Sequence, residues 1–379
     1  MTGNRQAYPL LISLANINME FRMKASNHAF LLLMLLPIPT FIANQNIKGA
    51  LEDHLIHECL DLILELLKTA ARIGIMLTDP AGNRCYCFTP LASYIVNTPE
   101  SALLAGMGGK TSSITTASYK EFGDPFHHEP CTASITLGQL DTLAAKINPW
   151  NFKDYLMEAK QLRLNGVHKL FWRDWALSNP SQFLTPEPLH HWHKQFWDHD
   201  IKWCIHVVGA AEIDFCFTIL HPHTGFQHFS EGISSLKQVT GREHRDIERY
   251  IIPLIARAVP KDFLIAVRSL MDFCYLVQAQ AIDDNTCGRI QAALSRFHAH
   301  KESIIWSGGR CGKKGHVIDN WYISKLEFMQ SVVPSIIANG AAIQWSANVT
   351  EHAHITIIKG PARMSNNHDY KYQICCHLD

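Results

Sequence analysis

The sequence predicts an α/β core that is interrupted by a large, mostly helical insertion. The first hundred residues alternate short apolar runs with one long amphipathic segment, in the order strand, strand, helix, strand. The middle of the chain has mainly helical periodicity. The 379 residues, 47% of them hydrophobic, are enough for a sizeable core that carries an insertion. We therefore expect a partial core at residues 1–109, the insertion at 110–340, and a C-terminal part of the core at 341–379.

The predicted core begins with two buried strands, Pro9–Ile17 and Phe30–Leu36, which are short and rich in Leu and Ile. Polar residues between them indicate a turn, so the two strands are expected to form a hairpin. In Lys48–Leu77 apolar side chains recur at three- and four-residue steps, which predicts an amphipathic helix. Turn residues from Asp79 onward end it. Cys85–Val96 is predicted to be a further buried strand.

The insertion is predicted to be helical after a Gly-rich and loop-like region that ends near Gly138. Asp283 and Asp284 stand where an N-cap would precede one of its helices. Gly308–Gly315 is predicted to be a flexible basic loop. The predicted helices are Leu140–Leu164, Pro188–Val208, His244–Ala258, Phe263–Gln280, Asn285–Ile305, Lys325–Ile337 and Asn348–Lys359.

Charge and targeting signals exclude several classes of protein. The 34 basic residues balance 34 acidic ones, so binding to a polyanion would need a local patch. The start of the chain has no signal-peptide pattern, and the longest apolar stretch, Ala29–Ala43, is too short to cross a membrane. Eleven irregularly spaced cysteines favour reduced thiols. We expect no membrane span and a cytosolic or nuclear compartment.

Clusters of histidine make a zinc site chemically reasonable, because imidazole is a good zinc ligand. The clusters lie at His127–His128, His190–His199 and His352–His354, but no CxxC pair occurs in the chain. Structural zinc usually shows closely paired ligands, so buried or exposed histidines without metal are the alternative.

Two enzyme signatures are incomplete. Gly109-Lys110-Thr111 resembles the end of a phosphate-binding loop, but Ala105 occupies the place of its first glycine. No GxSxG motif marks a nucleophile.

The residue at a strand end is more informative. Two-metal phosphoryl transfer needs Asp or Glu ligands that converge from separate elements, so a carboxylate would be expected there. The residue that follows the predicted strand Cys85–Val96 is Asn97. Its amide would be a weak, uncharged ligand.

The chain resembles the transposases of Plavaka-type elements, in the CACTA or EnSpm superfamily of DNA transposons abundant in mushroom-forming fungi. Five strings in order carry the resemblance. They are TGNRQAYPLLISLANI (2–17), YIVNTPE (94–100), FLTPEPLHHWHKQFWDHDIKW (183–203), FSEGISSLKQVTGREHRDI (229–247) and TEHAHITIIKGPARMSNN (350–367).

The resemblance implies an RNase H-like core with an Asp-Asp-Glu triad that binds two Mg²⁺ or Mn²⁺ ions. The family's first Asp lies upstream of Thr2, so we expect the core to lack its first strand and that acid. The second Asp matches Asn97. The Glu best matches Glu351, a catalytic and metal-binding candidate, with Glu231 as a weaker candidate.

Two further family features are altered. The place of a Cys-Pro-x-Cys pair holds Ser112, Ser113 and Thr115, which supply no thiolate. The family's Asp-x-x-His motif stands here as Glu187 to His190. The alternative for His190 is an ordinary surface or core histidine.

By resemblance, the family activity is metal-dependent DNA strand cleavage and transfer. With one of three acids left, we expect this chain to be catalytically incomplete and to hold neither Mg²⁺ nor Mn²⁺ stably. The implied partner is transposon-end DNA, in the nucleus, with no small-molecule substrate. Self-association is possible through an unpaired edge of the Pro9–Ile17 strand.

A non-catalytic DNA- or protein-binding remnant is the alternative function. Its features are the basic loop with Arg310, Lys313 and Lys314, and the mixed aromatic and basic residues between Trp192 and Trp203. A solvated loop and a core helix would explain the same residues, and the reading frame could also have no selected role.

Overall fold

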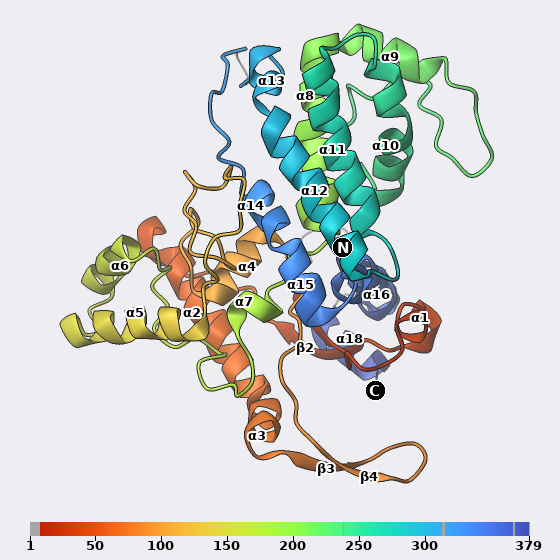
Figure 1. The fold of residues 1–379 in the computed structure, drawn as a ribbon. Coiled ribbons are helices and arrows are strands. Elements are labelled where there is room, and N and C mark those ends of the chain that lie inside the picture. The colour runs from red at the N-terminus through yellow and green to blue at the C-terminus, as the bar shows by residue number, and fades with distance from the viewer. Residues whose placement is uncertain (1–7, 238, 313–314, 367, 379) are drawn as a thin grey trace. The chain divides into compact units, whose positions relative to one another are not determined.

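The computed structural model describes the chain except residues 1–7, 238, 313–314, 367 and 379. The chain forms two compact units. One, here called the hairpin unit, comprises Met1–Thr116, Pro130–Thr185 and Gln344–Asp379, and the other, the helical unit, comprises Ala117–Glu129 and Pro186–Ile343. The described residues are mostly helical, and their strands form two sheets of two strands each (Figure 1).

The first sheet confirms the predicted hairpin, although its first strand ends at Ile12 instead of Ile17. β1 (Tyr8–Ile12) pairs with β2 (Leu31–Leu36) in antiparallel fashion, and the register shifts between Leu10 and Leu11. The short helices α1 (Met19–Arg22) and η1 (Ala25–Asn27) lie between the two strands in sequence. Within this sheet β1 pairs only with β2. Association through its other edge stays a prediction.

The predicted helix Lys48–Leu77 is confirmed in part. It forms α2 (Gln45–Ile63) and α3 (Glu65–Ile73), and it ends early because Gly74 adopts a φ of +74°, which takes the chain out of the helix. The next residues form β3 (Ile75–Thr78), which pairs with β4 (Arg84–Cys87). In Figure 1 this second hairpin extends as an arm from the end of α3.

The predicted strand Cys85–Val96 is wrong beyond Cys87. Pro90 has no amide hydrogen, and its neighbours bond to a distant loop instead of a strand. The Leu91 amide donates to Ser178 Oγ at 2.8 Å, and the Tyr94 amide donates to the Phe183 carbonyl at 2.7 Å.

The remaining helices of the hairpin unit come from both sides of the helical unit in sequence. The C-terminal helices bury Ile357, Ile358 and Ile374 against apolar residues of the first hairpin, including Leu11 and Leu32. These helices are α4 (Thr98–Ala105), α5 (Ala133–Lys146), α6 (Phe152–Gln161), α7 (Pro180–Phe183), α16 (Ala347–His354), η5 (Ile355–Lys359), α17 (Gly360–Met364) and α18 (Tyr370–Leu378). The predicted helix Leu140–Leu164 is divided between α5 and α6, and Asn348–Lys359 corresponds to α16 and η5.

The helical unit contains most of the predicted insertion helices, but the predicted helix Leu140–Leu164 lies in the hairpin unit, and the helix Ala210–Thr218 was not predicted. The Asp283 side chain caps the predicted helix after it, accepting from the Thr286 amide at 2.7 Å. α11 and α12 run side by side (Figure 1). The helices are η2 (Leu189–His193) and η3 (Phe196–Asp200), both π-helical, then α8 (Ile201–Val208), α9 (Ala210–Thr218), α10 (Gly241–Ile255), α11 (Lys261–Val277), α12 (Asp284–His300), α13 (Glu302–Trp306), α14 (Ser324–Gln330) and α15 (Val332–Asn339), followed by η4 (Ala342–Trp345).

The core of the helical unit is aromatic. Trp192 meets Phe273 edge to face at 6.1 Å, and Trp321 meets Trp203 and Phe297 in the same way at 5.6 and 5.9 Å.

None of the helices in the described part of the chain has the length and apolar character needed to span a bilayer.

Candidate functional site

Asn97, which the resemblance predicts to stand at the position of the family's second acid, is the N-cap of α4. Its Oδ1 accepts a hydrogen bond from the Glu100 amide at 3.0 Å, and a proline follows within the first turn. The side chain is exposed. Its one carbonyl oxygen is therefore engaged by the helix, and the amide brings no negative charge to attract a cation.

Glu351 lies on α16, with its side chain exposed. The opposite side of this helical segment is fixed to the first hairpin through Ala353 and Ile357. Arg22, between the two hairpin strands in sequence, donates to the Gln344 carbonyl at 3.0 Å just before α16. The hairpin and the helix that carries Glu351 thus belong to one packed unit.

Ser112, Ser113 and Thr115, which the resemblance predicts to replace the family's cysteine pair, are buried and form hydrogen bonds. Ser113 Oγ lies 2.5 Å from Ser101 Oγ. Ser112 Oγ accepts from the amides of Ile114 and Thr115 at 3.2 Å each. These hydroxyls shape the loop.

Glu231, the weaker alternative to Glu351, is exposed in the helical unit, in the loop before α10. The loop is held by Asp214 of α9, whose Oδ1 accepts from the amides of Ile233 and Ser234 at 2.8 Å each. The structure places Glu231 and Glu351 in different units.

Glu187 and His190, the altered Asp-x-x-His motif, do come together. Glu187 Oε1 lies 2.6 Å from His190 Nδ1, and its Oε2 accepts from the Leu189 amide at 2.9 Å. Burial alone would raise the pKa of Glu187, but the hydrogen bond from His190 and the charges of His191 and His190 outweigh it, so the pKa is lowered. Glu187 precedes η2, and its carboxylate binds the first two residues of that helix, which fits a structural role.

His191 is buried on the other side of this turn. Its Nδ1 donates to the Glu187 carbonyl at 3.1 Å, and its ring packs edge to face on Phe328 at 4.5 Å. Burial lowers the pKa of His191 to about 4, so the ring is neutral at physiological pH.

Arg310 of the predicted basic loop is 7% exposed. Its Nε donates to the Asn320 carbonyl, and its guanidinium lies 5.1 Å from the centre of the Trp321 ring. Burial lowers its pKa to about 10. Lys313 and Lys314 lie outside the described residues. A role for these three in DNA binding stays a prediction.

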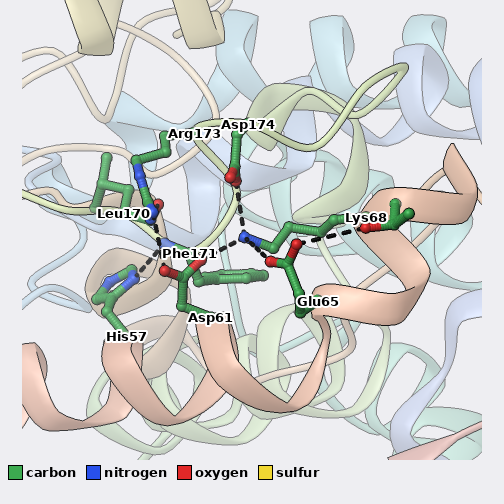
Figure 2. Close-up of polar contacts among 9 residues, drawn as sticks. His57, Asp61, Glu65, Lys68, Leu170, Phe171, Arg173 and Asp174 are labelled. Carbon is green, nitrogen blue, oxygen red and sulfur yellow. Dashed lines mark hydrogen bonds and ion pairs between the residues drawn. The ribbon is translucent and has the colours of Figure 1, made fainter. Parts of the chain in front are cut away.

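A network of ions that sequence reasoning missed joins α2 and α3 to the segment before α7 (Figure 2). Lys68, only 3% exposed, donates to Asp174 Oδ1 at 2.8 Å and to Asp61. Arg173 reaches the other oxygen of Asp61 at 2.9 Å. Burial opposes the charge of Lys68, but hydrogen bonds to Asp174 and Asp61 raise its pKa above the usual range.

His57 completes this contact between the helix and the loop. Its Nε2 donates to the Leu103 carbonyl at 3.0 Å, and its Nδ1 accepts from the Phe171 amide at 3.1 Å. These two bonds define a neutral tautomer, and burial lowers the pKa of His57 to about 4. The charges of the cluster are paired, and both ring nitrogens of His57 have hydrogen-bond partners. The cluster therefore fits a structural role in which it holds the helices to the loop. The spacing of His57, Asp61 and Lys68 along one helical face is the sequence signal for it.

A divalent metal pair does not fit the described donors. Among the residues that the structure describes, no group of three or more His, Cys, Asp or Glu side chains could hold a metal ion. Asn97 is neutral and capping, and the acids of the Figure 2 network are bound to Lys68 and Arg173.

Comparison with known protein families gives a match to residues 1–204. The family model described as Plavaka transposase matches residues 1–204, which is more than half of the chain. No curated protein and no solved structure matches it. The matched region contains the first hairpin, Asn97 at the start of α4, and the Glu187–His190 pair. On this match, the chain belongs to the Plavaka transposase family.

Proposed function

We propose that this chain is a transposase-derived protein that does not cleave DNA by itself. The family activity that the resemblance implies, within the CACTA superfamily, is metal-dependent strand cleavage and transfer on an RNase H-like core. Asn97 is the observation that carries the proposal. A two-metal site depends on carboxylates to offset the cost of stripping water from Mg²⁺, and here the amide of Asn97 caps α4.

A nuclease assay on the 379-residue chain tests this proposal. A labelled DNA duplex is incubated with Mg²⁺ or Mn²⁺ and the wild type or Glu351→Gln. We expect no metal-dependent nicking above background from either protein. Nicking by the wild type that Glu351→Gln abolishes would overturn the proposal, because it would show a working site around Glu351.

Binding of Mn²⁺ adds a test of position 97. Asn97→Asp keeps a good N-cap and restores a carboxylate, whereas Asn97→Ser keeps the cap without charge. If position 97 descends from a metal ligand, Asn97→Asp binds Mn²⁺ more tightly than the wild type and Asn97→Ser does not. Equal Mn²⁺ affinity in all three proteins would contradict the hypothesis that position 97 descends from a metal ligand.

DNA binding without cleavage is the second candidate, and an exposed aromatic corner of the hairpin unit favours it. Trp150, between α5 and α6, is 81% exposed and meets the His168 ring edge to face at 5.4 Å. Lys146 and Lys153, close to it in sequence, and Lys169, next to His168, are also exposed. Exposed rings with nearby cations suit stacking on bases beside phosphates. The proposed partner is transposon-end DNA in the nucleus.

A salt titration separates this candidate from a protein without DNA affinity. We expect binding to single-stranded DNA that weakens with rising salt, since phosphate contacts release counterions. Trp150→Ala should weaken it roughly fivefold to a hundredfold, the effect of losing one stacked base. Trp306→Ala is the matched control, because Trp306 is equally exposed, at 80%, in the helical unit. Equal loss in both variants would contradict a stacking site at Trp150.

A further inference from the structure

Two carboxyl groups that none of the candidate sites above includes lie in the core of the helical unit. Asp200, at the end of η3, is 1% exposed, and Glu248 of α10 has a fully buried side chain. Asp200 Oδ1 receives one long hydrogen bond, 3.4 Å, from Gln195 Nε2. Asp200 Oδ2 and both oxygens of Glu248 have no hydrogen-bond partner within the described part of the chain. Buried carboxyl oxygens in this state need an explanation.

The side chains that face the two carboxyls leave Asp200 Oδ2 and both Glu248 oxygens without a hydrogen bond in the described residues. His193 Nδ1 lies 3.5 Å from Glu248 Oε1, too far for a strong hydrogen bond. Lys325 of α14 acts on Asp200 electrostatically, but its ammonium binds Asp198 Oδ2 at 2.7 Å. Arg249 pairs with Asp246 at 3.2 Å. The other titratable groups that interact with the pair are neutral at physiological pH: Cys204 of α8, and Cys274 and Tyr275 of α11.

The π-helical segments bring these polar groups into the core. η2 and η3 follow one another between Leu189 and Asp200, and each wide turn adds a residue relative to an α-helix. His193, Gln195 and Asp200 are all buried in this stretch. These polar side chains are therefore buried within a packed helical segment and not in a surface loop.

An ionised carboxylate in such surroundings is expensive. Its desolvation costs several kcal/mol unless a partner offsets it, and a buried acid without one takes up a proton instead. For Asp200, burial first and then the nearby charge of Glu248 raise the pKa well above its usual range.

We propose that the helical unit folds with a proton bound to the Asp200 carboxyl beside Glu248, so that its folding takes up a proton and weakens as the pH rises. The sign follows from linkage. The stabilisation is complete below the unfolded pKa, about 3.9, and is lost as the pH rises toward the higher folded value. One bound proton changes the unfolding constant about tenfold per pH unit within that window.

Hydrogen exchange of the full chain tests the linkage. Opening constants of peptides covering 189–208 and 241–255, corrected for intrinsic exchange, are compared between the wild type and Asp200→Asn from pH 5 to pH 8. Asn keeps the size of the side chain without the titrating group. We expect the ratio of wild-type to variant opening constants to rise with pH, by up to about tenfold per unit. A ratio that does not change with pH would overturn the proposal.

Asp198→Asn is the matched control from the same π segment. The Asp198 carboxylate is ion-paired with Lys325, and although burial opposes it, this hydrogen bond lowers its pKa. Its loss also frees Lys325, which acts on Asp200, so Asp198→Asn should shift the pH dependence but, unlike Asp200→Asn, should not abolish it. If Asp198→Asn changes the pH dependence as Asp200→Asn does, the assignment to Asp200 is wrong.

Infrared spectroscopy gives a second readout that does not depend on unfolding. At neutral pH the wild type should show the C=O stretch of a buried, protonated carboxylic acid, and Asp198→Asn should keep it. Asp200→Asn should lose this band. If that variant does not fold, Glu248→Gln should shift the band, because it changes the neighbour of the Asp200 carboxyl. Absence of the band from the wild type would contradict a bound proton. A stoichiometric metal ion that is present in the purified wild type and absent from Asp200→Asn would also contradict a bound proton.

Discussion

Asn97 Oδ1 accepts the Glu100 amide hydrogen at 3.0 Å, so the residue expected to stand at a catalytic position stabilises the start of α4. Asn97→Ala removes this bond and should lower the free energy of unfolding by about 1 kcal/mol. Asn97→Asp keeps the cap and should change it by much less. Thermal unfolding of the three proteins measures the difference. Equal losses in both variants would mean that the cap contributes nothing.

The ammonium of Lys68 is the buried centre of the network in Figure 2. Lys68→Met keeps the length of the side chain but leaves Asp61 with Arg173 alone and Asp174 without its cation. We expect a loss of roughly 1.5 to 3 kcal/mol, the range for hydrogen bonds to charged groups. Urea unfolding measures it.

Lys48→Met is the control for this change, because Lys48 faces Glu52 across 3.9 Å in a partly exposed pair. Such pairs contribute about 0 to 1 kcal/mol. A loss in Lys68→Met no larger than in Lys48→Met would show that the network is not a stabilising tie.

His57 should make the hairpin unit sensitive to acid. Burial, the main cause, lowers its pKa to about 4, below the unfolded value of about 6.5. A depressed histidine stabilises the fold above the unfolded pKa, and this contribution is lost as the pH falls from about 6.5 toward 4. His57→Gln removes the titration. Hydrogen exchange of peptides containing Phe171 should show a wild-type to variant ratio that rises with acid, and a constant ratio would rule out His57 as the source.

Gly232 should tolerate no side chain. It has a φ of +76°, and a Cβ there would collide with the carboxylate of Asp214, which holds the loop. Gly232→Ala should destabilise the helical unit by more than the roughly 1 to 3 kcal/mol of backbone strain alone. Gly225→Ala isolates that strain, because Gly225 has a φ of +89° with open space around it. Similar losses in both variants would argue against the collision.

Local signals predicted much of the fold. The hairpin between β1 and β2 follows from two apolar runs and a polar connection, and the Asp283 cap follows from its place before a periodic segment. The strand at Cys85–Val96 failed because its amides bond to Ser178 and Phe183, far along the chain. No local pattern shows such a partner.

The candidate site was predicted less well. The series Asn97-Thr98-Pro99-Glu100 is itself a helix-start signal, so its role as a cap could have been read from the sequence. The pairing of Lys68 with Asp174 depends on how distant segments pack. The burial of Asp200 and Glu248 runs against what their charge predicts, and it is visible only in three dimensions.

The segments of the hairpin unit lie on both sides of the helical unit in sequence, which limits the order in which the two units can fold during synthesis. Leu11 and Leu32 are synthesised before the helical unit, whereas Ile358 and Ile374, which cover them, are synthesised after it. The helical unit, encoded between them, can complete its own core meanwhile. During translation the apolar face of the hairpin therefore stays uncovered by these helices until α16 to α18 have been made, so the hairpin unit completes its core only after the helical unit has been synthesised.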